Sequence, residues 1–136
     1  MTKEHAGDVS YSEDNELLTE FLTWSQDALA QMRGIIDELT DDTVRGDEGV
    51  CQLYDLAHNI KGMGSSFEFD LMTEVGLSLC GYLKAIEPDE SVSSRVLSSH
   101  VRIFEVVLKN RIKGNGGEQG AALKSRLATI ILEEAS

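Results

Sequence analysis

The segment CQLYDLAHNIKGMGS, residues 51–65, indicates the class of fold. At about 100° per residue on a helical wheel, its apolar side chains gather on one side. With Ile60 placed at zero, the residues within about 60° of it are Leu53, Leu56, Ala57, Met63, Gly64 and the following Phe67. This periodicity predicts a helix over residues 50–65 that packs one face against a core.

Further amphipathic segments lie on both sides of this one. We predict helices over residues 14–39, 71–86, 92–113 and 119–134. The first has a broad apolar stripe made of Leu17, Phe21, Trp24, Ala28, Met32, Ile35 and Leu39, widened by Leu18 and Ile36. The last places Leu123, Leu127 and Ile130 together. A single proline and the lack of alternating β-branched segments argue against a sheet. We therefore expect an all-α protein, an antiparallel four-helix bundle with an additional accessory helix.

Polar segments separate the predicted helices. Residues 41–49 form a loop with two glycines that leads into the second helix from about Asp47. Residues 66–70 interrupt the chain before the third helix, residues 87–91 end that helix, and residues 114–117 form a turn before the last. We expect a flexible tail over residues 1–12 and one domain over residues 13–136.

Composition narrows the functional classes. The net charge of −12 over 136 residues argues against nucleic-acid binding, which needs Lys and Arg to neutralise phosphates, and against an anionic membrane surface. The chain has no apolar run of roughly 18 residues and no secretory signal, and Cys51 and Cys80 lack metal-ligand spacing. We expect a cytoplasmic protein in which both cysteines are packing residues.

His58 falls opposite the apolar face of the 50–65 helix. It lies about 160° from Ile60, so the imidazole is predicted to project into solvent and not into the core. Gly62, Ser65 and Tyr54 fall within about 40° of it, and Lys61 within about 60°.

Two neighbours of His58 suit phosphorylation of a ring nitrogen. Glycine inside a helix costs about 1 kcal/mol relative to alanine, and on the solvent face close packing does not explain Gly62. Its missing side chain would leave clearance for a group bound to the ring. Lys61 would place an ammonium beside an anion on the imidazole. An accessible imidazole with steric clearance and a local positive charge indicates a nucleophilic histidine.

The string from His58 to Gly64 resembles the signature of the histidine phosphotransfer family, H-x-x-K-G followed by a small residue. Residues 65–67 and 71–83 are similar to the turn and third helix of bacterial members. Many members have glycine ten residues after the histidine, where this chain has Glu68.

The resemblance implies a phosphorelay intermediate of bacterial two-component signal transduction. His58 would accept a phosphoryl group from a receiver-domain aspartyl phosphate or from a sensor or hybrid histidine kinase, and pass it to another response-regulator receiver. The receiver would supply Mg²⁺, with Lys61 neutralising phosphate oxygens. The chain would carry no cofactor or metal of its own and would be a carrier, not a turnover catalyst. Tyr54 and Ser65 are the candidates for partner binding.

The other histidines and the aromatic and methionine residues have simpler explanations than a functional site. His5 and His100 are expected to be structural or incidental, and Trp24 and the Met32 stripe to be core. A di-metal bundle would need inward carboxylates with Glu-x-x-His spacing, which the sequence lacks. The alternative that stays open is a helical adaptor that docks on a receiver or kinase without being phosphorylated.

Overall fold

The computed structural model describes residues 15–135, which form five α-helices, a 3₁₀ turn and no β-strand. The elements are α1 (Asn15–Asp37), α2 (Glu48–Gly64), η2 (Ser65–Phe67), α3 (Asp70–Ala85), α4 (Ser94–Asn110) and α5 (Gly117–Ala135). The expected all-α class is confirmed. The predicted tail over residues 1–12, and His5 within it, lie outside the described residues.

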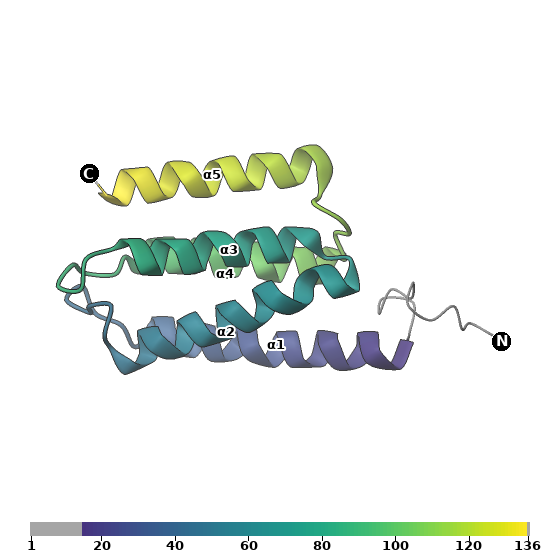
Figure 1. The fold of residues 1–136 in the computed structure, drawn as a ribbon, viewed down its shortest axis with the longest axis horizontal. Helices are drawn as coiled ribbons and strands as arrows, with labels where there is room; N and C mark the ends of the chain where they lie inside the picture. Colours follow the sequence, from purple (N-terminus) through teal and green to yellow (C-terminus); the bar gives the residue numbers. More distant parts are fainter. Residues whose placement is uncertain (1–14, 136) are drawn as a thin grey trace.

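Successive helices run in opposite directions along the long axis of the molecule (Figure 1). α1 packs on α2 and α4, and α3 packs on the same two helices, so each of the first four helices has two neighbours among them. α5 packs on α4 and, less extensively, on α3. It forms the edge of the molecule farthest from α1 (Figure 1).

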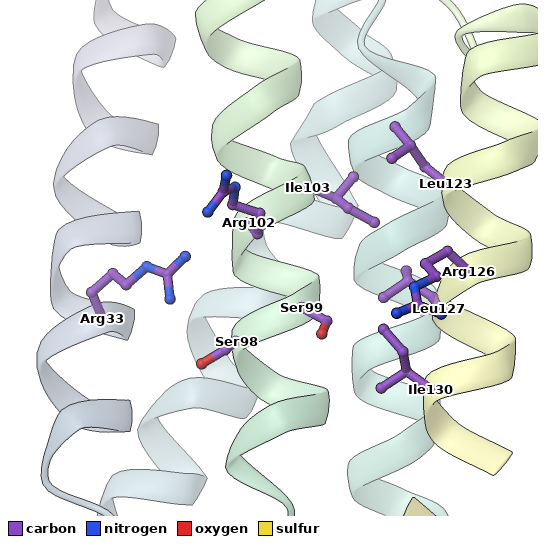
Figure 2. A pocket seen from close by; sticks show the side chains of 9 residues that line it. All are labelled: Arg33, Ser98, Ser99, Arg102, Ile103, Leu123, Arg126, Leu127 and Ile130. Carbon is purple, nitrogen blue, oxygen red and sulfur yellow. The ribbon is translucent and has the colours of Figure 1, made fainter. Parts of the chain in front are cut away.

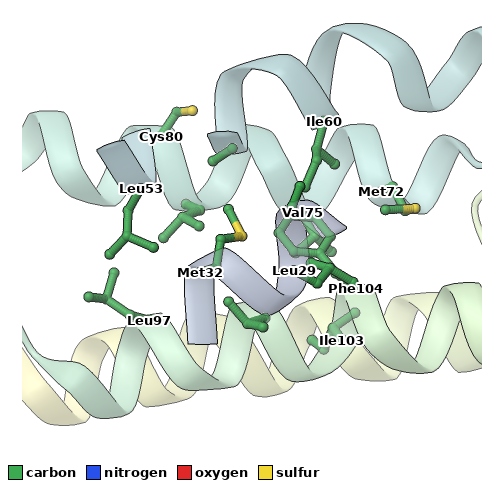
Figure 3. Packing of buried hydrophobic residues seen from close by; sticks show 14 of the residues in the cluster. Leu29, Met32, Leu53, Ile60, Met72, Val75, Cys80, Leu97, Ile103 and Phe104 are labelled. Atoms are coloured by element: carbon green, nitrogen blue, oxygen red, sulfur yellow. The ribbon is translucent and has the colours of Figure 1, made fainter. Parts of the chain in front are cut away.

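The core is apolar and receives side chains from every helix. Figure 3 shows Leu29 and Met32 of α1 near Leu53 and Ile60 of α2, with Phe104 of α4 close by. In α2, Leu53, Ala57, Ile60 and Gly64 are buried, whereas Leu56 and Met63 are only half-buried. The apolar face predicted from residues 51–65 is therefore the face that packs inward.

The predicted stripe of α1 is partly wrong. Its buried residues are Phe21, Leu22, Ser25, Ala28, Leu29, Met32 and Ile36. Trp24 is half-buried at the margin of the core, and Leu17 is 39% exposed. The buried arc is displaced because α1 contacts two helices at once, and its first turn projects beyond them (Figure 1).

Capping interactions move several helix ends by one to three residues. α2 begins after Asp47, whose carboxylate accepts hydrogen bonds from the backbone N–H groups of Gly49 and Val50 at 2.9 and 3.4 Å. α4 begins later than predicted because the Ser93 hydroxyl accepts a bond from Val96 N–H at 3.2 Å. It ends earlier because Arg111 adopts a left-handed conformation, with φ of 51°.

The break predicted at residues 66–70 is a tight turn anchored in the core. Phe67 stacks on Phe21 of α1 with ring centroids 4.3 Å apart, and Phe69 is fully buried. Glu68 between them has φ of 68°, a left-handed conformation that favours glycine. A glycine at position 68 would adopt this conformation without the strain that a side chain brings.

Candidate functional site

His58 lies on the exposed face of α2, one helical turn after Tyr54. The two rings are nearly parallel, with centroids 6.2 Å apart and an interplanar angle of 11°. Lys84 of α3 holds its ammonium 5.8 Å from the centroid of the Tyr54 ring. The sequence prediction that His58 projects away from the core is confirmed, and the residue is exposed.

Lys61 emerges at the seam between α2 and α3. A Cβ added to Gly76 of α3 would lie only 2.9 Å from Lys61 Cβ and 3.1 Å from Lys61 Cα, so the two helices nearly touch there. Burial raises the pKa of the nearby Cys80 thiol, and the positive charges of Lys61 and Lys84 partly oppose this rise. Within residues 15–135, Lys61 makes no ion pair.

Gly62 and Gly64 are two residues apart but have different surroundings. Gly62 is exposed, and a Cβ added there would meet no atom within 4 Å. Gly64 is buried, and a Cβ there would lie 2.8 Å from Thr73 Oγ1 and 2.9 Å from the carbonyl oxygen of Phe69. Packing therefore explains Gly64, whereas nothing in the packing of the described residues requires glycine at position 62.

Ser65 lies at the end of α2 in a hydrogen-bonded connection to α3. Its backbone N–H and its hydroxyl both donate to Thr73 Oγ1, at 3.0 and 3.1 Å. The Thr73 hydroxyl in turn donates to the carbonyl oxygen of Lys61 at 2.9 Å. Thr73 thus holds the backbone of Lys61 and the end of α2. Sequence reasoning missed it because threonine in a helix carries no specific signal.

His100 is a structural residue, as expected. It is fully buried, with Nδ1 2.7 Å from the carbonyl oxygen of Val96 and Nε2 2.8 Å from the Ser78 hydroxyl. In the neutral tautomer that fits both contacts, Nδ1–H donates to Val96 and Nε2 accepts from Ser78. Burial lowers the pKa of His100 below its ordinary value, which favours this neutral form.

The expectation that both cysteines are packing residues is wrong for Cys51. Cys80 is buried, but Cys51 is exposed on α2. Cys51 lines a cleft of about 320 Å³, together with Tyr54, Asp55 and Lys84. The cleft lies next to the exposed face of α2 that carries His58. Of the elements that line this cleft, α2 also carries His58, Lys61 and Gly62 of the predicted site.

Three further observations bear on the kind of site. Residues 15–135 contain no group of three or more His, Cys, Asp or Glu side chains placed to hold a metal ion. In the same range, none of the helices combines the length and the apolar character needed to span a bilayer. Comparison of the chain with protein-family models, curated proteins and solved structures gives no match. The assignment of function therefore rests on the geometry around His58.

Proposed function

We propose that this chain is a histidine phosphotransfer protein, a phosphorelay intermediate that carries a phosphoryl group on His58. The observation that carries the proposal is an exposed imidazole on α2 with the unpaired Lys61 and the open space at Gly62 on the same side. We further propose that α1–α4 form an antiparallel four-helix bundle, with α5 as the accessory helix. In this architecture α2 presents His58 on a rigid element.

The chemistry is an exchange of one phosphorus bond for another. The unprotonated nitrogen of the imidazole attacks the phosphorus of an aspartyl phosphate on a receiver domain, a N–P bond forms, and the P–O bond breaks to release the aspartate carboxylate. Attack on phosphohistidine by the aspartate of a second receiver reverses these changes. A kinase phosphohistidine is the other donor. Mg²⁺ is held by the partner receiver, so the chain itself needs no cofactor.

Lys61 and Gly62 have separate roles in this proposal. The Lys61 ammonium, one turn from His58, offsets charge on the phosphoryl oxygens. Gly62 leaves the side of the ring free for the phosphoryl group and the receiver. The docking surface surrounds His58 and includes Tyr54, whose ring stacks beside it, and Ser65 at the end of α2. We propose a bacterial, cytoplasmic protein, where receivers and kinases of this kind operate.

The direct test uses a phosphorylated receiver and the variants His58→Gln and Asn59→Ala. Asn59 is the exposed neighbour of His58, so its replacement is the matched control. Wild type and Asn59→Ala should acquire an acid-labile, base-stable label, and His58→Gln should acquire none. A normal label on His58→Gln would show that the site is wrong. If no variant, including wild type, is labelled by any receiver or kinase tested while the chain still binds one of them, the adaptor alternative is favoured.

Two further variants test the neighbours of the ring. Lys61→Ala should transfer about 10-fold more slowly, because a single charge-assisted contact to a transferring group is worth at least about 1.4 kcal/mol. Gly62→Leu should fold, since nothing in the described structure occupies the space beside Gly62, but should transfer slowly. Transfer by Gly62→Leu at the wild-type rate would contradict the clearance argument.

A further inference from the structure

The imidazole of His58 has an aromatic neighbour on its own helix. Tyr54 precedes it by one turn, and the two rings lie nearly parallel, with an interplanar angle of 11° and centroids 6.2 Å apart. At this separation parallel rings are offset and not face to face, which is a favourable geometry for an aromatic pair. The offset leaves most of each ring face uncovered. Tyr54 can therefore restrict the plane of the imidazole without covering it.

Tyr54 is itself held in place from two sides. Its side chain is half-buried and packs against the hydrophobic core. Lys84 of α3 places its ammonium 5.8 Å from the centroid of the Tyr54 ring, within the range of a cation–π interaction. The backbone at Lys84 is anchored in turn, because Arg45 Nη1 donates to the carbonyl oxygens of Lys84 and Ile86 at 2.9 and 2.7 Å. These contacts run from the loop before α2, through the end of α3, to Tyr54.

The residues around the other edge of the molecule belong to a separate part of the fold. Figure 2 shows a groove of about 380 Å³ that is lined by residues of α1, α4 and α5. Ile103, Leu127 and Ile130 in this groove are buried. The contacts that bear on the orientation of the His58 imidazole are therefore those of α2 and α3 with Tyr54.

We propose that Tyr54 is a positioning residue for His58, and that Lys84 acts on His58 through Tyr54. This role rests on the proposed function of His58 as phosphoryl acceptor. In transfer, the unprotonated ring nitrogen attacks phosphorus, the N–P bond forms, and the P–O bond to the receiver aspartate breaks. The attacking lone pair lies in the plane of the imidazole, so the orientation of that plane decides whether the lone pair points at phosphorus. The Tyr54 ring favours one plane before the receiver docks, which leaves less ordering for the transition state.

The test compares transfer from a phosphorylated receiver to Tyr54→Phe, Tyr54→Leu, Lys84→Gln and the double variant Tyr54→Leu/Lys84→Gln. Phenylalanine keeps the ring, whereas leucine keeps apolar volume without an aromatic ring. Gln52→Leu, at an exposed position of α2, is the matched control for a new leucine on this helix. The transfer rate is measured against receiver concentration, which gives the rate at saturation and the half-saturating concentration. If Tyr54→Leu folds poorly, Tyr54→Phe and Lys84→Gln carry the test, because Lys84 is exposed.

We expect Tyr54→Leu to lower the transfer rate at saturating receiver about 10-fold, because a misoriented ring reacts in fewer encounters, with a smaller change in the half-saturating concentration. Tyr54→Phe should transfer within about twofold of the wild-type rate, since stacking does not need the hydroxyl. Lys84→Gln should lower the saturating rate about threefold. The double variant should be no slower than Tyr54→Leu, because Lys84 acts through the ring that is already missing. Gln52→Leu should transfer at the wild-type rate.

Proton NMR of the His58 side chain gives a second readout that needs no receiver. In the wild type and Tyr54→Phe, His58 should have one dominant χ1 rotamer, and its ring protons should be shifted by the neighbouring aromatic ring. Tyr54→Leu should lose both features. A role of Tyr54 in stability alone would leave the rotamer of the exposed His58 unchanged.

Four outcomes would count against this role. A wild-type protein that no phosphorylated receiver labels would overturn the proposed function and the role of Tyr54 with it. Labelling of the wild type, together with undiminished saturating rates in Tyr54→Leu and Lys84→Gln, would overturn the positioning role alone. So would a loss confined to the half-saturating concentration, which would show that Tyr54 only contacts the receiver, or equal rotamer averaging of His58 in the wild type and Tyr54→Leu.

Discussion

Gly76 lies at a close contact between α3 and α2, and its replacement by alanine tests how tightly Lys61 is held. The added Cβ would lie 2.9 Å from Lys61 Cβ, 3.1 Å from Lys61 Cα and 3.3 Å from the carbonyl oxygen of Ala57. None of these atoms is the flexible end of a side chain. The clash is therefore relieved only by moving the backbones of α2 and α3 apart.

Two opposing effects set the size of the change. Alanine is favoured over glycine inside a helix by about 1 kcal/mol. Overpacking a tight contact costs about 1–3 kcal/mol, and the rigid neighbours here place the cost near the upper end. We expect Gly76→Ala to lower the free energy of unfolding by about 1–2 kcal/mol. Gly81→Ala in the same helix should raise it by about 1 kcal/mol, because a Cβ at the exposed Gly81 meets no atom within 4 Å.

The assay is equilibrium urea unfolding followed by circular dichroism. The slope of the free energy of unfolding against urea concentration is compared between variants. The midpoint should fall for Gly76→Ala and rise for Gly81→Ala, with unchanged slopes. If both variants were stabilised equally, the close approach of α2 and α3 at Lys61 would be refuted.

For three other substitutions we predict the direction in which the stability of the fold, or its dependence on pH, changes. Ser25→Ala should stabilise the fold by about 1 kcal/mol in urea unfolding, because its buried hydroxyl has no hydrogen-bond partner among the described residues; a loss of stability would contradict this. Glu68→Gly should raise the free energy of unfolding by about 1 kcal/mol in the same assay, because glycine adopts the left-handed backbone conformation without strain. An unchanged urea midpoint would refute that reasoning. The buried His100 binds its proton at lower pH when folded than when unfolded. Stability should therefore decline as the pH falls below about 6.5, less steeply in His100→Gln. Equal declines in the two proteins would contradict this assignment.

The helical periodicity of residues 51–65 was enough to place His58 on the exposed side of α2. One helix has one inward face, and its apolar residues identify that face wherever the neighbours lie. The same reasoning located Gly62 in open space, because a residue adjacent to His58 on the wheel shares its exposure. The earlier start of α2 after Asp47 also has a local cause, since an N-cap acts on residues two and three positions ahead.

Helical periodicity does not predict contacts between distant segments. The sequence of α1 alone does not show that Ser25 is buried and Leu17 exposed, because the burial of these residues depends on where α2 and α4 pack against α1. Phe69 was predicted to lie in a helix break, yet it is fully buried beside the ring of Phe21, on which Phe67 also stacks.

The helical class and the exposed face that carries His58 could be predicted from the sequence, because both follow from interactions within a few residues along the chain. The helix packing was needed to show that Gly76 lies against Lys61, that Thr73 donates to the Lys61 carbonyl oxygen, and that Arg102 and Arg126 line one groove. Each of these contacts joins residues on different helices. Their distances depend on how the helices pack, which is a property of the whole core.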